Sequence, residues 1–285
     1  MVQLFVNGLL LGGVYAMISI GLTLIWGVME IVNFAHGEFL MIAMYLTFWL
    51  FHLYGMNPYL SLFAVTPILF LLGLLTQKII INPILDAPST SQIFATLGLS
   101  ILLQNLALFF WKADYRSVQM PHLISNLKYH GLIISFPRLM AFAIALVMVF
   151  ALFLFLKKTY LGKALRATVE NKRAAKLMGV NIQRFYYLAL GIGTGCVGIA
   201  GAVFTPMYPV FPTSGSYFVL TAFVVVVLGG MGSMAGAFVG GLIIGVVESF
   251  SGFFLSSVLK EVVYFLVFIM ILVLKPSGLL GKAIR

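Results

Sequence analysis

Long apolar runs dominate this sequence and leave few folds open to it. Hydrophobic residues make up 62% of the 285 positions and charged residues only 8%, whereas a soluble domain has about 25% charged residues. The runs are around 20 residues long, which is the length a helix needs to cross a hydrocarbon layer about 30 Å thick. A barrel strand would alternate in polarity over about 10 residues, and residues 140–156 show no such alternation. The sequence therefore predicts an all-α polytopic membrane protein.

The apolar runs predict a bundle of eight to ten transmembrane helices that forms one membrane-embedded domain over residues 1–285. Residues 112–137 contain short β-branched patches and are expected to form an extracytoplasmic hairpin, while residues 157–184 are expected to form a polar cytoplasmic loop. The first run is expected to remain as a transmembrane helix, because no basic segment precedes it. Nine spans are predicted, at residues 3–27, 32–52, 58–77, 91–111, 138–156, 185–207, 217–230, 235–250 and 258–275.

The basic residues predict the orientation of the chain in the membrane. With the 157–184 loop placed in the cytoplasm, twelve Lys and Arg residues fall inside and five outside. By the positive-inside rule this predicts an N-terminus outside the cell and a C-terminus in the cytoplasm. The formal net charge of +10 then reflects topology and contact with anionic membrane lipid, and no nucleic-acid partner is expected.

The 157–184 loop carries eight of the seventeen Lys and Arg residues against a single acid, Glu170. It is rich in helix formers, and Gly179 is suited to the left-handed position after a helix end. Ala174, Leu177 and Met178 recur at the spacing of one helical face. Two interpretations stay open: a helical element that docks into a groove of a cytosolic partner, or an amphipathic helix held to anionic lipid.

Two stretches interrupt the apolar pattern, at residues 30–38 near the start and 228–236 near the end. Interrupted spans at matching positions in two halves of a transporter indicate an internal repeat and the substrate route. Ionisable groups at membrane depth usually face a bundle interior. We therefore expect a re-entrant or broken segment near residues 33–38, and we interpret the polar and glycine residues of the two stretches as a translocation pathway or hinge. This set is Asn33, His36, Gly37, Glu38, Gly229, Gly230 and Gly232. The alternative interpretation of the first stretch is a helix start, in which Asn33 caps a helix that begins at Phe34.

Small residues recur at spacings of three and four in two late spans. In lipid such stripes let helix backbones approach closely, so these glycines are assigned to helix packing: Gly191, Gly195, Gly198, Gly236 and Gly240. The single Cys196 is expected to be a packing residue. Glu248 lies near a predicted span end and is expected to be an interfacial carboxylate.

The residue patterns of enzymes and metal sites are absent from the sequence. There is no metal-spaced His/Cys cluster, no nucleophile elbow and no acid/base pair away from lipid, so no catalytic activity and no metal are expected. No G-x-x-x-x-G-K-[ST] motif occurs, because Gly162-Lys163 and Gly281-Lys282 are both followed by Ala. This chain therefore cannot cradle ATP phosphates, and energy for transport must come from another subunit.

Four ordered motifs give the chain a specific resemblance. They are Arg166-Ala-x-x-Glu-Asn-x-x-Ala-Ala-x-x-x-Gly-Val-Asn181, Val32-Asn-Phe-Ala-His-Gly-Glu38, Leu228-Gly-Gly-Met-Gly-Ser-x-x-Gly-Ala-x-x-Gly-Gly241 and Leu274-Lys-Pro-x-Gly-Leu-x-Gly281. Together they resemble the permease subunits of branched-chain amino-acid ABC importers, the LivH type. The resemblance extends from Gly8 to Gly281. It departs from the family at Asn171, where the family often has an acid.

The resemblance implies a single permease domain in the inner (plasma) membrane whose residues 160–181 form a coupling loop to an ATPase. The implied coupling residues are Arg166, Glu170, Ala174, Ala175 and Gly179. The implied partners are a second related permease, which makes a heterodimer, two ATP-binding subunits and an extracytoplasmic solute-binding protein. No cofactor is expected on this chain, since ATP and Mg²⁺ would bind to the partner subunits.

The function that follows from the resemblance is translocation of branched-chain or other aliphatic amino acids. Two alternatives stay open. The same family architecture can carry urea or short amides, and a secondary transporter or channel can work without partners. The latter needs ion-coupling carboxylates or discontinuous helices that hold the substrate.

Overall fold

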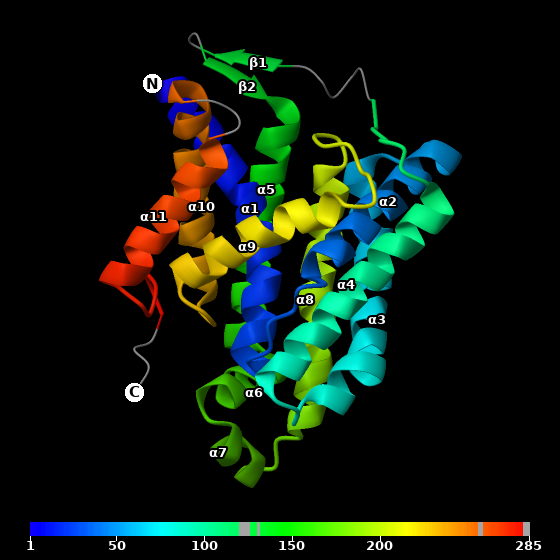
Figure 1. The fold of residues 1–285 in the computed structure, drawn as a ribbon, viewed down its shortest axis with the longest axis vertical. Coiled ribbons are helices and arrows are strands. Elements are labelled where there is room, and N and C mark those ends of the chain that lie inside the picture. The colour runs from blue at the N-terminus through cyan, green and yellow to red at the C-terminus, as the bar shows by residue number, and fades with distance from the viewer. Residues whose placement is uncertain (120–125, 130–131, 256–258, 282–285) are drawn as a thin grey trace.

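The computed structural model describes residues 1–119, 126–129, 132–255 and 259–281, and it is almost entirely helical (Figure 1). Within these residues seven helices are long and apolar enough to cross a membrane, so the chain is an all-α polytopic membrane protein. They are α1 (Val2–Met29), α2 (His36–Tyr54), α3 (Pro58–Thr76) with the short π- and 3-10 turns Gln77–Ile81 and Asn82–Ile84, α4 (Ser89–Trp111), α5 (Phe136–Lys158), α8 (Ile182–Phe204) and α10 (Met234–Phe254).

Each of the nine predicted spans contains a helix, but two of these helices are short. They are α9 (Ser214–Gly229) with 16 residues and α11 (Lys260–Leu274) with 15 residues. A full crossing takes about 20 residues. The predicted positions of the nine helices are therefore confirmed. Seven of the described helices are long enough to cross the membrane.

Helix α1 runs through the centre of the bundle (Figure 1), and its middle and second half are buried almost without interruption. It packs closely along α10. A Cβ atom at Gly8 or Gly12 would lie 2.6 Å from the α10 backbone, and Gly241 and Gly245 face α1 in the same way. Small residues let the two backbones approach, because lipid gives no hydrophobic drive for helix association. The sequence analysis did not identify this glycine seam.

The break between α1 and α2 brings the chain back into the bundle. Helix α1 ends at Met29, and Glu30 has a left-handed backbone with φ 61°. Residues 30–35 are not helical, and α2 then begins at His36, whose Nε2 lies 3.1 Å from the carbonyl oxygen of Ile18. At 1.5 Å per residue, Ile18 is about 16 Å along α1 from its end. The segment is therefore re-entrant, as Figure 1 also shows, and α2 starts deep in the membrane.

A second helix begins at the same depth. After α8 ends at Phe204, residues 205–213 connect to α9, and the first residues of α9 meet those of α2 at Gly215 and Gly37. The break at 30–38 is thus paired in space with 205–215. The other interruption, 228–236, lies instead against the end of the chain, where Leu279 N donates to Leu228 O at 2.8 Å. The proposed repeat that relates the two interruptions stays a prediction.

The two ends of the bundle differ. One end carries the antiparallel strands β1 (Asn126–Tyr129) and β2 (Leu132–Ser135), and we call it the β-hairpin end. In this hairpin Asn126 pairs with Ser135. These strands lie inside the predicted hairpin at 112–137. The start of α1 lies there too, because the Gln3 side chain exchanges hydrogen bonds of 2.6 and 2.8 Å with the Ile133 backbone. The opposite end, here the α6–α7 end, carries α6 (Tyr160–Glu170) and α7 (Lys172–Leu177) (Figure 1).

Candidate functional site

A cluster of polar side chains lies where α2 and α9 begin. It consists of Glu38, Ser100, Gln104 and Ser216, and we call it the junction cluster. Glu38 Oε1 accepts hydrogen bonds from Ser100 Oγ at 3.1 Å, Gln104 Nε2 at 2.8 Å and Ser216 Oγ at 3.1 Å. Ser100 is the middle residue of α4, so the cluster lies half way along a helix that is long enough to cross a membrane. The sequence analysis named only Glu38 among the four.

His36 and Asn33 lie beside this cluster in sequence but have different surroundings. Both are buried, and His36 Nε2 donates to the Ile18 carbonyl, since a carbonyl oxygen only accepts. Asn33 is not the helix cap that the sequence predicted. Helix α2 begins two residues later than expected. At the start of this helix Asn33 makes a backbone contact, in which its carbonyl oxygen accepts a hydrogen bond from His36 N at 3.2 Å. The Asn33 side chain is buried without a hydrogen-bond partner.

Gly37 and Gly215 make the approach of α2 and α9 possible. A Cβ atom on either residue would collide with the backbone of the other, and one on Gly215 would also lie 2.6 Å from Glu38 Oε2. Thr96 Oγ1 of α4 donates to the Val32 carbonyl at 3.0 Å. The re-entrant segment is therefore held from both sides, by α9 and by α4.

The late glycines of the predicted pathway lie elsewhere, near the α6–α7 end. Gly230 and Gly232 have positive φ angles of 102° and 82° in the turn between α9 and α10. A Cβ atom on Gly230 would collide with Gly281, and Leu280 N donates to Gly229 O at 3.0 Å. The structure thus divides the predicted pathway residues between two places, a junction at mid depth and a glycine turn at one end.

Helices α6 and α7 form an amphipathic element. Asn171 links them: it ends α6, and its Oδ1 accepts from Ala174 N at 3.0 Å to cap α7. Gly179 follows α7 with φ 82°. Of the predicted coupling residues, Ala175 is buried against the bundle, and the others are exposed: Arg166, Glu170, Ala174 and Gly179.

The most exposed apolar side chains of this element are Leu177 and Met178, which are 88% and 84% exposed. Their exposure could not be inferred from helical periodicity, because the same spacing fits a buried face. They lie at the end of α7 among exposed basic residues. Exposed apolar side chains that are surrounded by polar residues are typical of a protein–protein interaction site.

Two contacts connect the α6–α7 element to the membrane helices near the re-entrant segment. Lys172 Nζ lies 3.1 Å from Glu30 Oε1, so the first residue of α7 pairs with the residue that follows α1. Gly27 of α1 lies next to Gly232, and a Cβ atom on it would reach Val169 of α6 at 3.9 Å. The element therefore contacts the start of the re-entrant segment, and it lies near Gly27 of α1, which is itself next to the glycine turn.

Glu248 is not the interfacial carboxylate that the sequence predicted. It is 6% exposed, it accepts a hydrogen bond from Tyr15 Oη at 2.5 Å, and its Oε1 lies 2.7 Å from Lys260 Nζ. Lys260 is the first residue of the short α11. Glu248 of α10 thus contacts both α1 and α11. These two contacts give the buried carboxylate the partners that a buried charge requires.

The predicted packing glycines lie at helix contacts of different closeness. A Cβ atom on Gly236 would collide with Gly229, one on Gly240 would lie 2.9 Å from Val225 O, and one on Gly198 would lie 3.0 Å from Thr66 Cα. Gly191 faces the Phe70 ring, whereas Gly195 makes only ordinary contact with α3.

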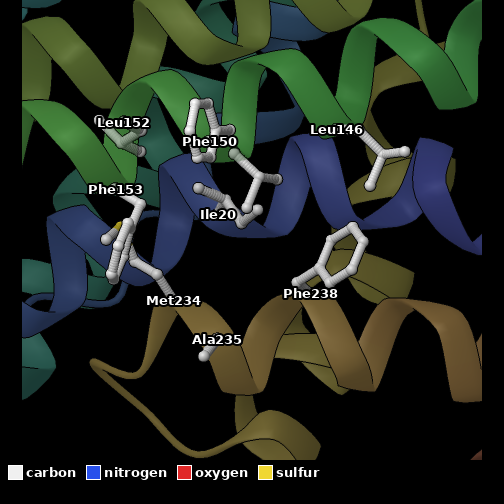
Figure 2. A pocket seen from close by; sticks show the side chains of 9 residues that line it. Ile20, Leu146, Phe150, Leu152, Phe153, Met234, Ala235 and Phe238 are labelled. Atoms are coloured by element: carbon white, nitrogen blue, oxygen red, sulfur yellow. The ribbon is translucent and has the colours of Figure 1, made fainter.

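Two apolar cavities open between the helices. One of about 280 Å³ lies between α1, α5 and α10, and Figure 2 shows Ile20, Phe150 and Phe238 lining it, one from each of the three helices. The other, of about 650 Å³, lies between α3, α5 and α8 and is lined by Cys196 among apolar residues. Neither is lined by a charged side chain.

Comparison with known proteins identifies the family of this chain. The family described as "Branched-chain amino acid transport system / permease component" matches residues 4–273. The chain therefore belongs to this family of membrane permeases.

Curated relatives match over nearly the whole chain. The "High-affinity branched-chain amino acid transport system permease protein BraD" of Pseudomonas aeruginosa is 31% identical over 98% of this chain and 95% of its own. LivH of Escherichia coli K12, of the same description, is similar to the same extent. The "Probable branched-chain amino acid transport permease protein LivH" of Methanocaldococcus jannaschii is 26% identical over 93% of this chain and 88% of its own. No solved structure matches the chain.

Proposed function

We propose that this chain is the permease subunit of an ABC importer that translocates branched-chain or other aliphatic amino acids. It would lie in the inner membrane with its N-terminus outside and its C-terminus in the cytoplasm. It would act with a second related permease, two ATP-binding subunits and an extracytoplasmic solute-binding protein. The names of the relatives support the cargo, and the observation that carries the mechanism is the exposed α6–α7 element with its contacts to the re-entrant segment.

The α6–α7 element is suited to transmit force from an ATPase. Its tip offers Leu177 and Met178 to a partner, and its other face is packed on the bundle through buried Leu165 and Ala175. The Lys172–Glu30 pair lies at the base of the re-entrant segment. A displacement of α7 by a closing ATPase dimer would therefore reach the residues that lead to the junction cluster.

ATP and Mg²⁺ do not belong on this chain, because no phosphate-binding loop is present in its sequence. The partner subunits would hydrolyse ATP, and this chain would move in response. The substrate route would form between the two permeases and be largely apolar, so that selection of the cargo lies mainly with the solute-binding protein.

Uptake measurements in proteoliposomes test the assignment. The chain is purified with its co-expressed neighbours and reconstituted with ATP on the side of the ATP-binding subunits. Leucine uptake that requires both ATP and those subunits is the expected result. Uptake by this chain alone would favour the secondary transporter, and uptake of urea or a short amide in place of leucine would favour the other cargo.

A double variant, Leu177→Asp with Met178→Asp, tests the docking surface. Because both side chains are exposed, the permease should fold normally but lose the ATP-binding subunit during purification, and uptake should fall with it. Tyr54→Asp is the control, since Tyr54 is 78% exposed at the far end of α2 and lies away from the element. Retention of the ATP-binding subunit by the double variant would contradict the proposed docking.

A further inference from the structure

The Glu38 carboxylate has hydrogen-bond donors but no cation. Its three partners, on α4 and α9, are neutral side chains that all donate to Oε1. Oε2 is buried without a partner. Among the described residues no Lys, Arg or His side chain forms an ion pair with it. By contrast the other buried acid, Glu248, is paired with Lys260 at 2.7 Å.

Burial opposes a negative charge on Glu38, but two features of its surroundings stabilise one. It is the third residue of α2, and Ser216 is the third residue of α9, so the carboxylate lies at the N-termini of two helices. Helix N-termini carry partial positive charge and stabilise an anion. Three hydrogen bonds to one oxygen add to this, because hydrogen bonds to an ionised group are stronger than those between neutral groups. These donors offset a part of the cost of burying the carboxylate, which has no cationic partner among the described residues.

The junction cluster can be reached from outside the helix core. Glu38 is fully buried, but Gln104 and Ser216 in front of it are partly exposed. Polar groups half way across a membrane normally face a protein interior or a water-filled route and not lipid. This indicates that the surface between α4 and α9 is covered in the assembly by protein or lines a passage.

An apolar surface continues from the cluster along α9. Leu220 and Phe223 follow Ser216 at spacings of four and three, so they share its helical face. Leu220 is 53% exposed, and the Phe223 ring lies 5.1 Å from that of Phe34 in the re-entrant segment. A negative group beside an apolar strip complements a molecule that has a cationic end and an aliphatic chain.

We propose that Glu38, Ser100, Gln104 and Ser216 form a transient binding site for the ammonium group of an amino acid during its passage, with the aliphatic side chain on the Leu220–Phe223 strip. This rests on the proposed function. The Glu38 carboxylate would supply the charge, and Gln104 and Ser216 would be the groups that first meet the cargo. The site would guide a zwitterion past the membrane centre, where its ammonium group would otherwise lose its hydration without replacement.

Thiol labelling in the reconstituted importer, with its partner subunits present, tests this site. Cys196 is the only native cysteine and is replaced by Cys196→Ala, after which Ser216→Cys provides one reactive group. The labelling rates of a cationic and an anionic methanethiosulfonate are compared with and without Glu38→Gln. Each rate is divided by the rate of the same reagent with a free thiol in solution, because a thiolate by itself favours the cationic reagent. Since local potentials of several kT concentrate opposite charge, the normalised rate of the cationic reagent should be about tenfold higher, and Glu38→Gln should remove this preference.

The cargo provides the second measurement. Leucine, with the solute-binding protein and ATP, should slow the labelling, and Glu38→Gln should lower leucine uptake at least several-fold. Asp86→Asn, at an exposed loop acid, controls for the loss of one negative charge. Recovery of the intact complex shows that Glu38→Gln folds, and Ser100→Ala, a milder change in the same cluster, should reduce the charge preference in part.

The outcomes separate the two proposals. Normal leucine uptake with no labelling, or with labelling that ignores reagent charge, would overturn the site and leave the proposed function intact. A charge preference that leucine does not alter would also overturn it, since the site would then attract other cations and not the cargo. Absence of ATP-dependent leucine uptake in the unmodified complex would overturn the proposed function itself.

Discussion

The junction cluster and the α6–α7 element are built in opposite ways. The junction surrounds a buried carboxylate on α2 that accepts hydrogen bonds from α4 and α9, and its two glycines allow backbone contact. The α6–α7 element is exposed and basic, and capping side chains from its own sequence define its helices. The first depends on contacts between residues far apart in the chain, whereas the second is specified locally. This difference suits a part that must be rigid at membrane depth and a part that must meet another protein.

The largest expected effect is at the junction. Gly37→Val should prevent α2 and α9 from meeting, because any Cβ atom there collides with the Gly215 backbone. We expect little folded protein, since overpacking against backbone leaves no side chain that can move away. Gly179→Ala in the α6–α7 element should yield folded protein with a small loss of stability, because its φ of 82° is strained for Ala but nothing lies within 4 Å of the added atom. Size-exclusion chromatography in mild detergent measures both, and equal yields would contradict the contrast.

A smaller effect is expected at the buried ion pair. Lys260→Met should destabilise the fold by about 3 kcal/mol, since removal of one partner leaves a buried charge uncompensated. Thermal unfolding in detergent measures the change. The combination with Glu248→Gln should recover a part of the loss, because the second substitution removes the unpaired charge. A loss in the double variant equal to the sum of the two single losses would show that the residues do not interact.

The smallest effect on stability is expected at the exposed pair of Glu30 and Lys172. Their side chains are 68% and 33% exposed, and such pairs contribute at most about 1 kcal/mol. Lys172→Glu should therefore leave the melting temperature almost unchanged but lower leucine uptake, since α7 would be repelled from the start of the re-entrant segment. The exchange Glu30→Lys with Lys172→Glu should restore uptake. If the exchange gave no recovery, the pair would have no part in coupling.

Part of the candidate site was accessible from the sequence because it is local. The Glu30–Glu38 interruption marks the re-entrant segment, since polar residues stop an apolar run wherever the chain later lies. The caps at Thr159, Asn171 and Asn181 are likewise within three residues of the groups that they bind. The partners of Glu38 were not accessible: they lie 62, 66 and 178 residues away, and no periodicity relates them.

The membrane class, the positions of the helices and the amphipathic element could be predicted because they follow from hydrophobicity and propensity along the chain. Contacts between helices became visible in the folded molecule alone: the meeting of residues 30–38 with 205–215, the burial of Glu248 against Lys260, and the central seam of Gly8, Gly12, Gly241 and Gly245. The physical reason is that lipid removes most of the hydrophobic drive between helices. Their arrangement then depends on close backbone contact and on hydrogen bonds between distant residues, and neither leaves a local pattern in the sequence.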